Sequence, residues 1–142
     1  MALYTQEDLI NFIKEADLKV TDHRLSVLQQ IAKAKQPIAS HILIEQLKKK
    51  YDIDQATVYR NLTSLHNAGI LRRLDFNHGH AHYEIDTGKS SNQFVCSTCE
   101  TIEKIEGVSA DDILKKMMRK SRKFKTIQNA NIEIYGLCKN CA

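Results

Sequence analysis

The sequence predicts an α+β fold, with a helical first part followed by a smaller part that mixes strands with one helix. Three observations support this. Apolar residues recur at helical spacing as far as residue 68, and strand-like alternation begins after Gly69. All four cysteines lie in the last third of the 142-residue chain. The small polar stretch "DTGKSS", which starts at Asp86, separates the two parts, so we expect a boundary after Asp86.

Four helices are expected in the first part, each starting at a residue whose side chain can accept a backbone hydrogen bond. These capping residues are Thr5, Thr21, Ser40 and Asp54. Asp8 would complete a capping box with Thr5. The only proline, Pro37, marks a break before the third helix, and Gly69 ends the fourth. The residues expected to face the core are Leu9, Ile10, Ile13, Ala16, Leu25, Leu28, Ile31, Ala32, Ile42, Leu43, Leu47, Val58, Leu62 and Leu65.

A β-hairpin is expected next, with strands "ILRRLDF" and "HAHYEI" around a turn at Asn77–Gly79. We call this hairpin, residues 70–85, the wing. Short helices followed by such a hairpin form a winged helix-turn-helix, which offers the helix before the hairpin to the DNA major groove. That helix carries polar, non-acidic residues at Gln55, Thr57, Tyr59, Arg60, Asn61 and Ser64. Such side chains can read base edges, although singly each is more often an ordinary solvated residue.

The second part is expected to alternate strands ("QFVC", "TIEKI", "TIQNANIEIYGLC") with one helix from Ser109 to about Arg122. The polar stretch "DTGKSS" precedes it. The net charge of +4 arises entirely in residues 87–142, mostly within the run "KKMMRKSRKFK" at residues 115–125. Because basic residues suit the C-terminal end of a helix, this run is interpreted as a solvated helix end rather than as a DNA-binding patch.

The cysteines form two pairs, "CSTC" (Cys96, Cys99) and "CKNC" (Cys138, Cys141), separated by 38 residues. Two such turns can complete a tetrahedral cage of four thiolates around a structural Zn²⁺ ion. The alternatives are a redox pair or four unrelated thiols. A thioredoxin-like pair would begin a helix, and neither pair does so here.

Together, "LKVTDHRLSVL", "ATVYRNLTSLHNAGIL", "HYEI", "FVCSTCETIEKIEG" and "IEIYGLCKNC" resemble the ferric uptake regulator family of bacterial metal-responsive transcription factors. The resemblance is colinear over nearly the whole chain. It implies a winged-helix DNA-binding domain at residues 1–86, a hinge at 87–91, and an α/β dimerisation domain with structural zinc at 92–142. It further implies a homodimer that binds a palindromic operator on double-stranded DNA, usually as a repressor.

The resemblance also implies roles for single residues. Tyr59 and Arg60 match recognition-helix contacts to bases, and Lys19 matches a residue that reaches the minor groove or the backbone. The expected DNA-binding set is Lys19, Arg24, Thr57, Tyr59, Arg60 and Asn61. The structural zinc ligands would be Cys96, Cys99, Cys138 and Cys141.

The chain departs from the family pattern at the regulatory metal site. The histidine-rich run that family members carry before the first cysteine pair is "KSSNQFVC" here, and Ser, Asn and Gln are poor ligands for transition metals. Pro37 and Lys104 replace two further ligands, so that only Glu84 remains in position.

Three histidines in "NHGHAHYE" offer a substitute for the lost ligands. His78, His80, His82 and Glu84 would share one face of a strand and could hold a second divalent ion, Zn²⁺, Fe²⁺ or Mn²⁺. However, alternate residues of an extended strand lie about 7 Å apart, so one ion would take only about two of them. The alternative is a hydrated wing tip whose histidines touch DNA phosphates or nothing.

Other functions rank lower. The first alternative is a family member that binds DNA independently of a sensed metal. Peroxide sensing, a zinc-ribbon adaptor and a thiol redox protein are less favoured. There is no catalytic constellation, so enzyme activity and a small organic substrate are not expected. No apolar run is long enough for a transmembrane helix, and we expect a cytoplasmic protein without a membrane partner.

Overall fold

The computed structural model describes residues 3–142 and divides the chain into two compact units, with the boundary between Asp86 and Thr87. The N-terminal unit holds four helices and three strands, and the C-terminal unit holds three strands and one helix. No helix within residues 3–142 combines the length and the apolar character needed to cross a bilayer.

The helices of the N-terminal unit are α1 (Gln6–Glu15), α2 (Asp22–Lys33), α3 (Ser40–Lys50) and α4 (Gln55–Asn67). The expected capping box of α1 is confirmed: the Thr5 hydroxyl accepts from the Asp8 amide, and the Asp8 carboxylate accepts from the Thr5 amide. The side chains of Thr21 and Asp54 cap α2 and α4 as expected. Gly69 follows α4 with a φ of 80°, the left-handed conformation that ends a helix.

The sheet of the N-terminal unit contains a strand that the sequence did not predict. Its order is β1 (Ile38–Ala39), β3 (Ala81–Ile85) and β2 (Leu71–Asp75), with antiparallel neighbours. Because Ala39 pairs with His82, the segment after Pro37 is extended. Ala39 is therefore the N-cap of α3, and the expected capping role of Ser40 was wrong.

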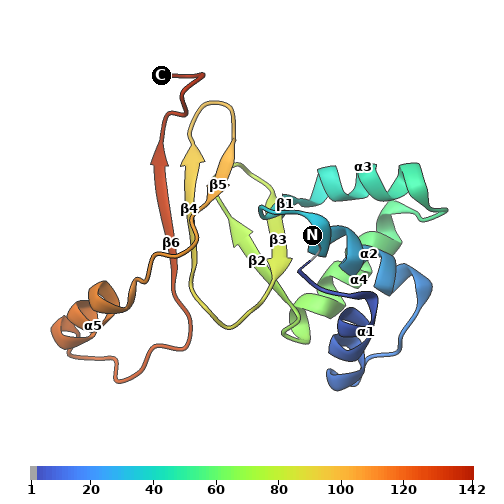
Figure 1. The fold of residues 1–142 in the computed structure, drawn as a ribbon, viewed down its shortest axis with the longest axis horizontal. Coiled ribbons are helices and arrows are strands. Elements are labelled where there is room, and N and C mark those ends of the chain that lie inside the picture. Colours follow the sequence, from blue (N-terminus) through green and yellow to red (C-terminus); the bar gives the residue numbers. More distant parts are fainter. Residues whose placement is uncertain (1–2) are drawn as a thin grey trace. The chain divides into compact units, whose positions relative to one another are not determined.

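A single hydrophobic core lies between the four helices and this sheet, which are grouped together in Figure 1. It includes Leu28, Leu43, Leu62 and Leu65, none of which is exposed to solvent. Ile42, which we expected to face the core, is 42% exposed. Ile44 is buried beside Leu43 and Leu47 instead, so the buried stripe of α3 is rotated from the predicted one.

The C-terminal unit is built on a second sheet with the order β5 (Ile102–Lys104), β4 (Ser91–Cys96) and β6 (Asn131–Gly136). β4 and β6 are parallel, and the crossover between them contains α5 (Asp111–Lys120). Within this unit α5 stands clear of the sheet (Figure 1) and buries no residue of its own. Its N-cap is Ala110, one residue later than predicted, and Ser109 accepts instead from the Asp111 amide.

Candidate functional site

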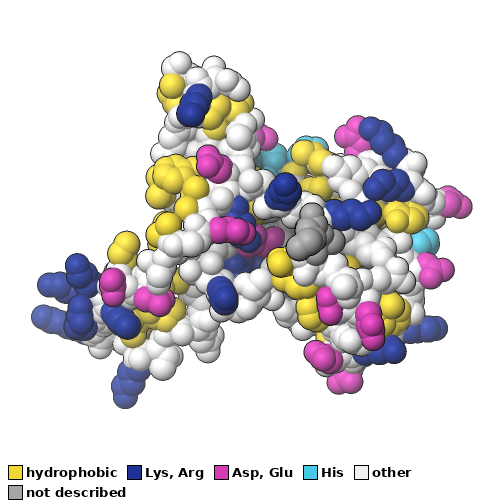
Figure 2. All heavy atoms as spheres, viewed as in Figure 1, with side chains coloured by type: hydrophobic (Ala, Val, Ile, Leu, Met, Phe, Trp, Pro, Cys, Tyr) yellow, Lys and Arg dark blue, Asp and Glu magenta, His cyan; other side chains and the backbone are white. Residues whose placement is uncertain are grey.

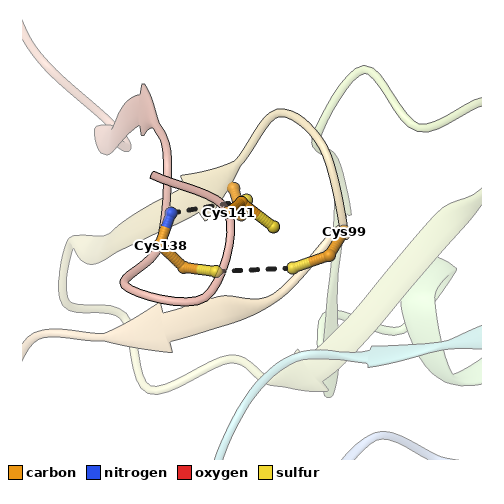
Figure 3. A group of neighbouring side chains, drawn as sticks. Cys99, Cys138 and Cys141 are labelled. Atoms are coloured by element: carbon orange, nitrogen blue, oxygen red, sulfur yellow. Dashed lines mark hydrogen bonds between the residues drawn. The ribbon is translucent and has the colours of Figure 1, made fainter.

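The four cysteines gather at one end of the second sheet. Cys96 ends β4 and pairs in register with Gly136, the last residue of β6, so the two Cys-x-x-Cys turns leave the sheet side by side. All four sulfur atoms lie within 4.8 Å of one another. The sulfurs of Cys99 and Cys138, which point toward each other in Figure 3, are 3.6 Å apart. Thiolates on a tetrahedral Zn²⁺ ion are separated by about 3.8 Å, so these residues fit that ion.

The protonation of these thiols is set by their neighbours. Hydrogen bonds from the backbone amides of Cys99 and Cys138 lower the pKa of Cys96 to about 6. Hydrogen bonds with Thr101 lower the pKa of Cys99. The nearby thiols of Cys138 and Cys99 raise the pKa of Cys141 to about 12. The neighbours therefore favour the thiolate form of Cys96 and Cys99 and oppose that of Cys141, and a divalent cation would supply the positive charge needed to hold four thiolates together. A site closed by four sulfurs leaves no open position for catalysis.

The structure brings three of the four candidate regulatory residues together. His78, His80 and His82 each offer a ring nitrogen, and these nitrogens lie within 4.8 Å of one another. Glu84 does not join this group. Its carboxylate is buried and accepts from the guanidinium of Arg72 at 3.1 Å, and a second nitrogen of Arg72 lies 3.0 Å from Asp86.

The outer face of α4 presents part of the expected DNA-binding set. Tyr59 is 41% exposed, and Arg60 is exposed beside it. A guanidinium nitrogen of Arg60 donates to the Thr57 hydroxyl at 3.1 Å, which orients the arginine along the helix. Asn61 lies differently: it is buried, and its amide donates to the Thr57 carbonyl at 2.9 Å.

The two other candidates lie around the start of α2. Lys19 is exposed in the preceding loop, and Arg24 is half-buried in the first turn of the helix. The guanidinium of Arg24 donates to the Lys19 carbonyl at 2.5 Å. Arg24 thus holds the loop that presents Lys19.

Sequence reasoning overlooked two contributors to these sites. His41 was not among the predicted site residues, yet its ring centre lies 4.8 Å from that of His80. Arg72 was not singled out, although it faces Glu84 in the β2–β3 register. Both relationships depend on strand register, which single residues in the sequence do not reveal. The opposite charges of Arg72 and Glu84, on neighbouring predicted strands, were the one available signal.

Comparisons with known proteins agree with this arrangement. The model of the ferric uptake regulator family matches residues 15–135. A ferric uptake regulation protein of Vibrio parahaemolyticus is 36% identical over 134 residues, which cover 89% of this chain and 85% of that protein. One from Legionella pneumophila is 31% identical over 137 residues, covering 91% and 95%.

The crystal structure of the Vibrio cholerae ferric uptake regulator superposes with a TM-score of 0.76 at 28% identity, covering 90% of this chain and 98% of that one. The likeness thus spans both units and is found in sequence and fold alike. The chain belongs to the ferric uptake regulator family of metal-binding, DNA-binding transcription regulators.

Proposed function

We propose that the chain acts as a homodimer that binds a palindromic DNA operator and represses transcription, with α4 in the major groove. The observation that carries the proposal is the outer face of α4. No acidic residue occurs between Gln55 and Asn67, and Tyr59 and Arg60 extend from the helix into solvent. An arginine can donate two hydrogen bonds to guanine, and an aromatic ring can contact a thymine methyl group.

Further contacts would come from elements around α4. Lys19 is exposed on a loop held by Arg24, a suitable position for contacting the sugar–phosphate backbone or the minor groove. Thr57 acts by orienting Arg60. Asn61 is not retained among the proposed contacts, because its amide is buried and bonded to the backbone.

The surface of the C-terminal unit supports the homodimer. Its large apolar side chains are exposed to an extent unusual for a monomer, as Figure 2 shows; they lie on α5, on β4, on the edge strand β6 and on the segments next to α5 and β6. These residues are Phe94, Val108, Ile113, Met117, Phe124, Ile127, Ile134, Tyr135 and Leu137. An edge strand with apolar side chains and an amphipathic helix without a partner are suited to association with a second copy.

The cysteine cluster would hold structural Zn²⁺ and thereby join the ends of β4 and β6. Zinc supplies folding free energy to such a closed site. Because the exposed face of β6 belongs to the same sheet, loss of the ion would also weaken the surface proposed for dimerisation.

A second candidate function is a regulator that binds DNA independently of a sensed metal. The buried pair of Arg72 and Glu84 favours it, because the guanidinium already provides a cation at that carboxylate. DNA-binding titrations with and without Zn²⁺, Fe²⁺ or Mn²⁺ at fixed salt separate this candidate from a regulator that requires a sensed metal. An affinity unchanged by every metal would leave only the second candidate.

The test of the recognition helix uses two substitutions of Arg60. Duplexes selected by the protein from a random library supply the specific target, and shuffled duplexes supply the comparison. Arg60→Ala should weaken specific binding by about 1–3 kcal/mol and relax the preference at one base pair. Arg60→Lys keeps the charge but loses the two-pronged geometry, so it should lose specificity while retaining affinity for shuffled duplexes. If both variants keep the parental specificity, α4 does not read the bases through Arg60.

A further inference from the structure

We propose that His78, His80, His82 and His41 form a second metal site, which lies wholly within the N-terminal unit and links the wing to α3. The proposal concerns metal binding alone and does not depend on the DNA-binding role of the chain. It differs from the site expected from the sequence, because histidine replaces Glu84 and every ligand is an imidazole.

The ring positions agree with coordination of one ion. The ring centre of His78 lies 5.8 Å from that of His80 and 5.8 Å from that of His82, and the ring centres of His80 and His82 are 5.0 Å apart. An imidazole bound at about 2.1 Å has its centre about 3.2 Å from the ion, so two rings on a tetrahedral ion have centres about 5.2 Å apart. The spacing of the three ring centres is therefore close to the spacing that a shared ion requires.

The backbone of the wing turn explains why the histidines converge. Asn77 and Gly79 have φ values of 61° and 77°, and both left-handed residues bend the chain sharply. The Asp75 carboxylate accepts from the Asn77 amide at 2.9 Å and fixes the start of the turn. Only His82 lies on β3, while His78 and His80 lie in the turn. The spacing of an extended strand, which limited a shared ion to two ligands, does not apply here.

The environment of His78 favours an ion. Neither ring nitrogen of His78 reaches solvent, and neither has a hydrogen-bond partner among the described residues. A buried polar atom left unbonded is destabilising, and coordination of an ion would satisfy one of the two nitrogens. Phe76, which is fully buried, packs against the rings of His82 and His78 and gives the site an apolar floor.

His41 is placed to complete the site by the β1–β3 register. Ala39 pairs with His82 and α3 begins at Ser40, so the β1–β3 pairing brings the first turn of α3, which carries His41, next to the wing turn. The ring centres of His41 and His80 lie 4.8 Å apart. His41 is exposed at the start of α3, so a side-chain rotation can bring its nitrogen to an ion held by the other three. Coordination would then tie the wing turn to the first turn of α3.

The chemistry of the ligands selects the ion. Glu84 is held by Arg72 in a pair whose side chains are each 8% exposed, so the site contains no carboxylate. Four neutral imidazoles suit Zn²⁺ and its neighbours Co²⁺, Ni²⁺ and Cu²⁺, whereas Mn²⁺ prefers oxygen ligands. The expected ion is therefore Zn²⁺ or a metal of similar preference, and Mn²⁺ is disfavoured.

The test is a titration of Co²⁺ into the full chain after its cysteine cluster has been loaded with Zn²⁺. Four-coordinate Co²⁺ has visible d–d bands, and nitrogen ligands would give these bands without the charge-transfer absorption that thiolates add. We expect one Co²⁺ per chain beyond the zinc, displaced by added Zn²⁺ and not by Mn²⁺. Saturation without the visible bands, or with the thiolate absorption, would overturn the proposal.

Two substitutions and a control locate the ion. His80→Gln and His41→Gln keep a polar side chain but remove a metal ligand. Changing a residue that only hydrogen-bonds to a ligand already weakens metal binding roughly 10- to 100-fold, so each variant should weaken Co²⁺ binding by at least that factor. His23→Gln, at an exposed position on α2 outside the cluster, should leave it unchanged. X-ray absorption of the Zn²⁺-loaded parent gives a readout that needs no variant. A Co²⁺ affinity that is insensitive to His80→Gln, or a zinc spectrum containing sulfur neighbours alone, would refute the site.

Discussion

Arg72 and Glu84 face each other across the β2–β3 ladder as a buried ion pair, with a guanidinium nitrogen 3.1 Å from the carboxylate oxygen. A second nitrogen of Arg72 lies 3.0 Å from Asp86, the last residue of the N-terminal unit. One arginine therefore fixes the base of the wing and the end of the unit together. It also occupies the carboxylate that the sequence suggested for metal binding.

Removing Glu84 should strongly destabilise the N-terminal unit. Glu84→Ala removes the buried carboxylate that pairs with the buried guanidinium of Arg72, and breaking a buried ion pair in this way costs about 3–5 kcal/mol. Urea unfolding followed by helical circular dichroism reports on this unit, because it contains four of the five helices. Glu45→Ala is the matched control, since its pair with Lys49 is solvent-exposed and is worth at most about 1 kcal/mol. Equal losses in the two variants would show that the Arg72–Glu84 pair does not stabilise the wing.

Zinc binding by the cysteine cluster should release fewer protons near neutral pH than the four thiols contain. The pKa of Cys96 is lowered to about 6, so above this pH Cys96 is already a thiolate in the metal-free chain. As the pH falls through about 6, Cys96 becomes protonated in the metal-free chain. Zinc binding then releases one more proton, so the zinc affinity falls more steeply with falling pH below about 6 than above it. Calorimetry in buffers of different ionisation enthalpy counts the protons.

Cys96→Ser provides the control for this assignment. The variant should lose the change of slope near pH 6, because the titrating group is gone. Release of all four protons at neutral pH by the parent would contradict the low pKa of Cys96.

A metal at the wing histidines should strengthen DNA binding, if both proposals hold. Residues 1–86 carry equal numbers of basic and acidic side chains. A divalent ion bound by neutral ligands would therefore give this unit a net positive charge, which attracts DNA phosphates. Affinity for a duplex should rise by roughly 5-fold or more on metal binding. The salt dependence should steepen by about one phosphate contact.

Fluorescence anisotropy over a series of salt concentrations measures both quantities. His80→Gln should retain the metal-free affinity and lose the metal-dependent increase. An increase that persists in His80→Gln would place its origin elsewhere in the chain.

Features set by short-range interactions could be predicted from the sequence. The caps at Thr5, Thr21 and Asp54 and the helix end at Gly69 each depend on residues within one turn, and all were found. The gathering of the four cysteines was predicted because two Cys-x-x-Cys turns are typical of a four-cysteine zinc site.

Features set by strand register could not be predicted. The two-residue strand β1 exists through its pairing with β3, and this pairing displaced the cap of α3 from Ser40 to Ala39. The same pairing placed His41 beside His80. The convergence of His78 on the other rings depends on the bend at Asn77 and Gly79, whereas the sequence pattern indicated only alternation along a strand.

The most direct measurement is the mass, by sedimentation, of the complex with a palindromic duplex selected from a random library. The free chain should have twice the 16.3 kDa chain mass, and the complex should contain two chains per duplex. Ile113→Glu, on a residue of α5 that is 57% exposed, should give monomers with much weaker binding. Ile42→Glu, on the 42% exposed residue of α3, should keep the dimer. A monomeric parent, or one that binds no duplex in preference to shuffled sequence, would contradict the proposal of a dimeric DNA-reading regulator.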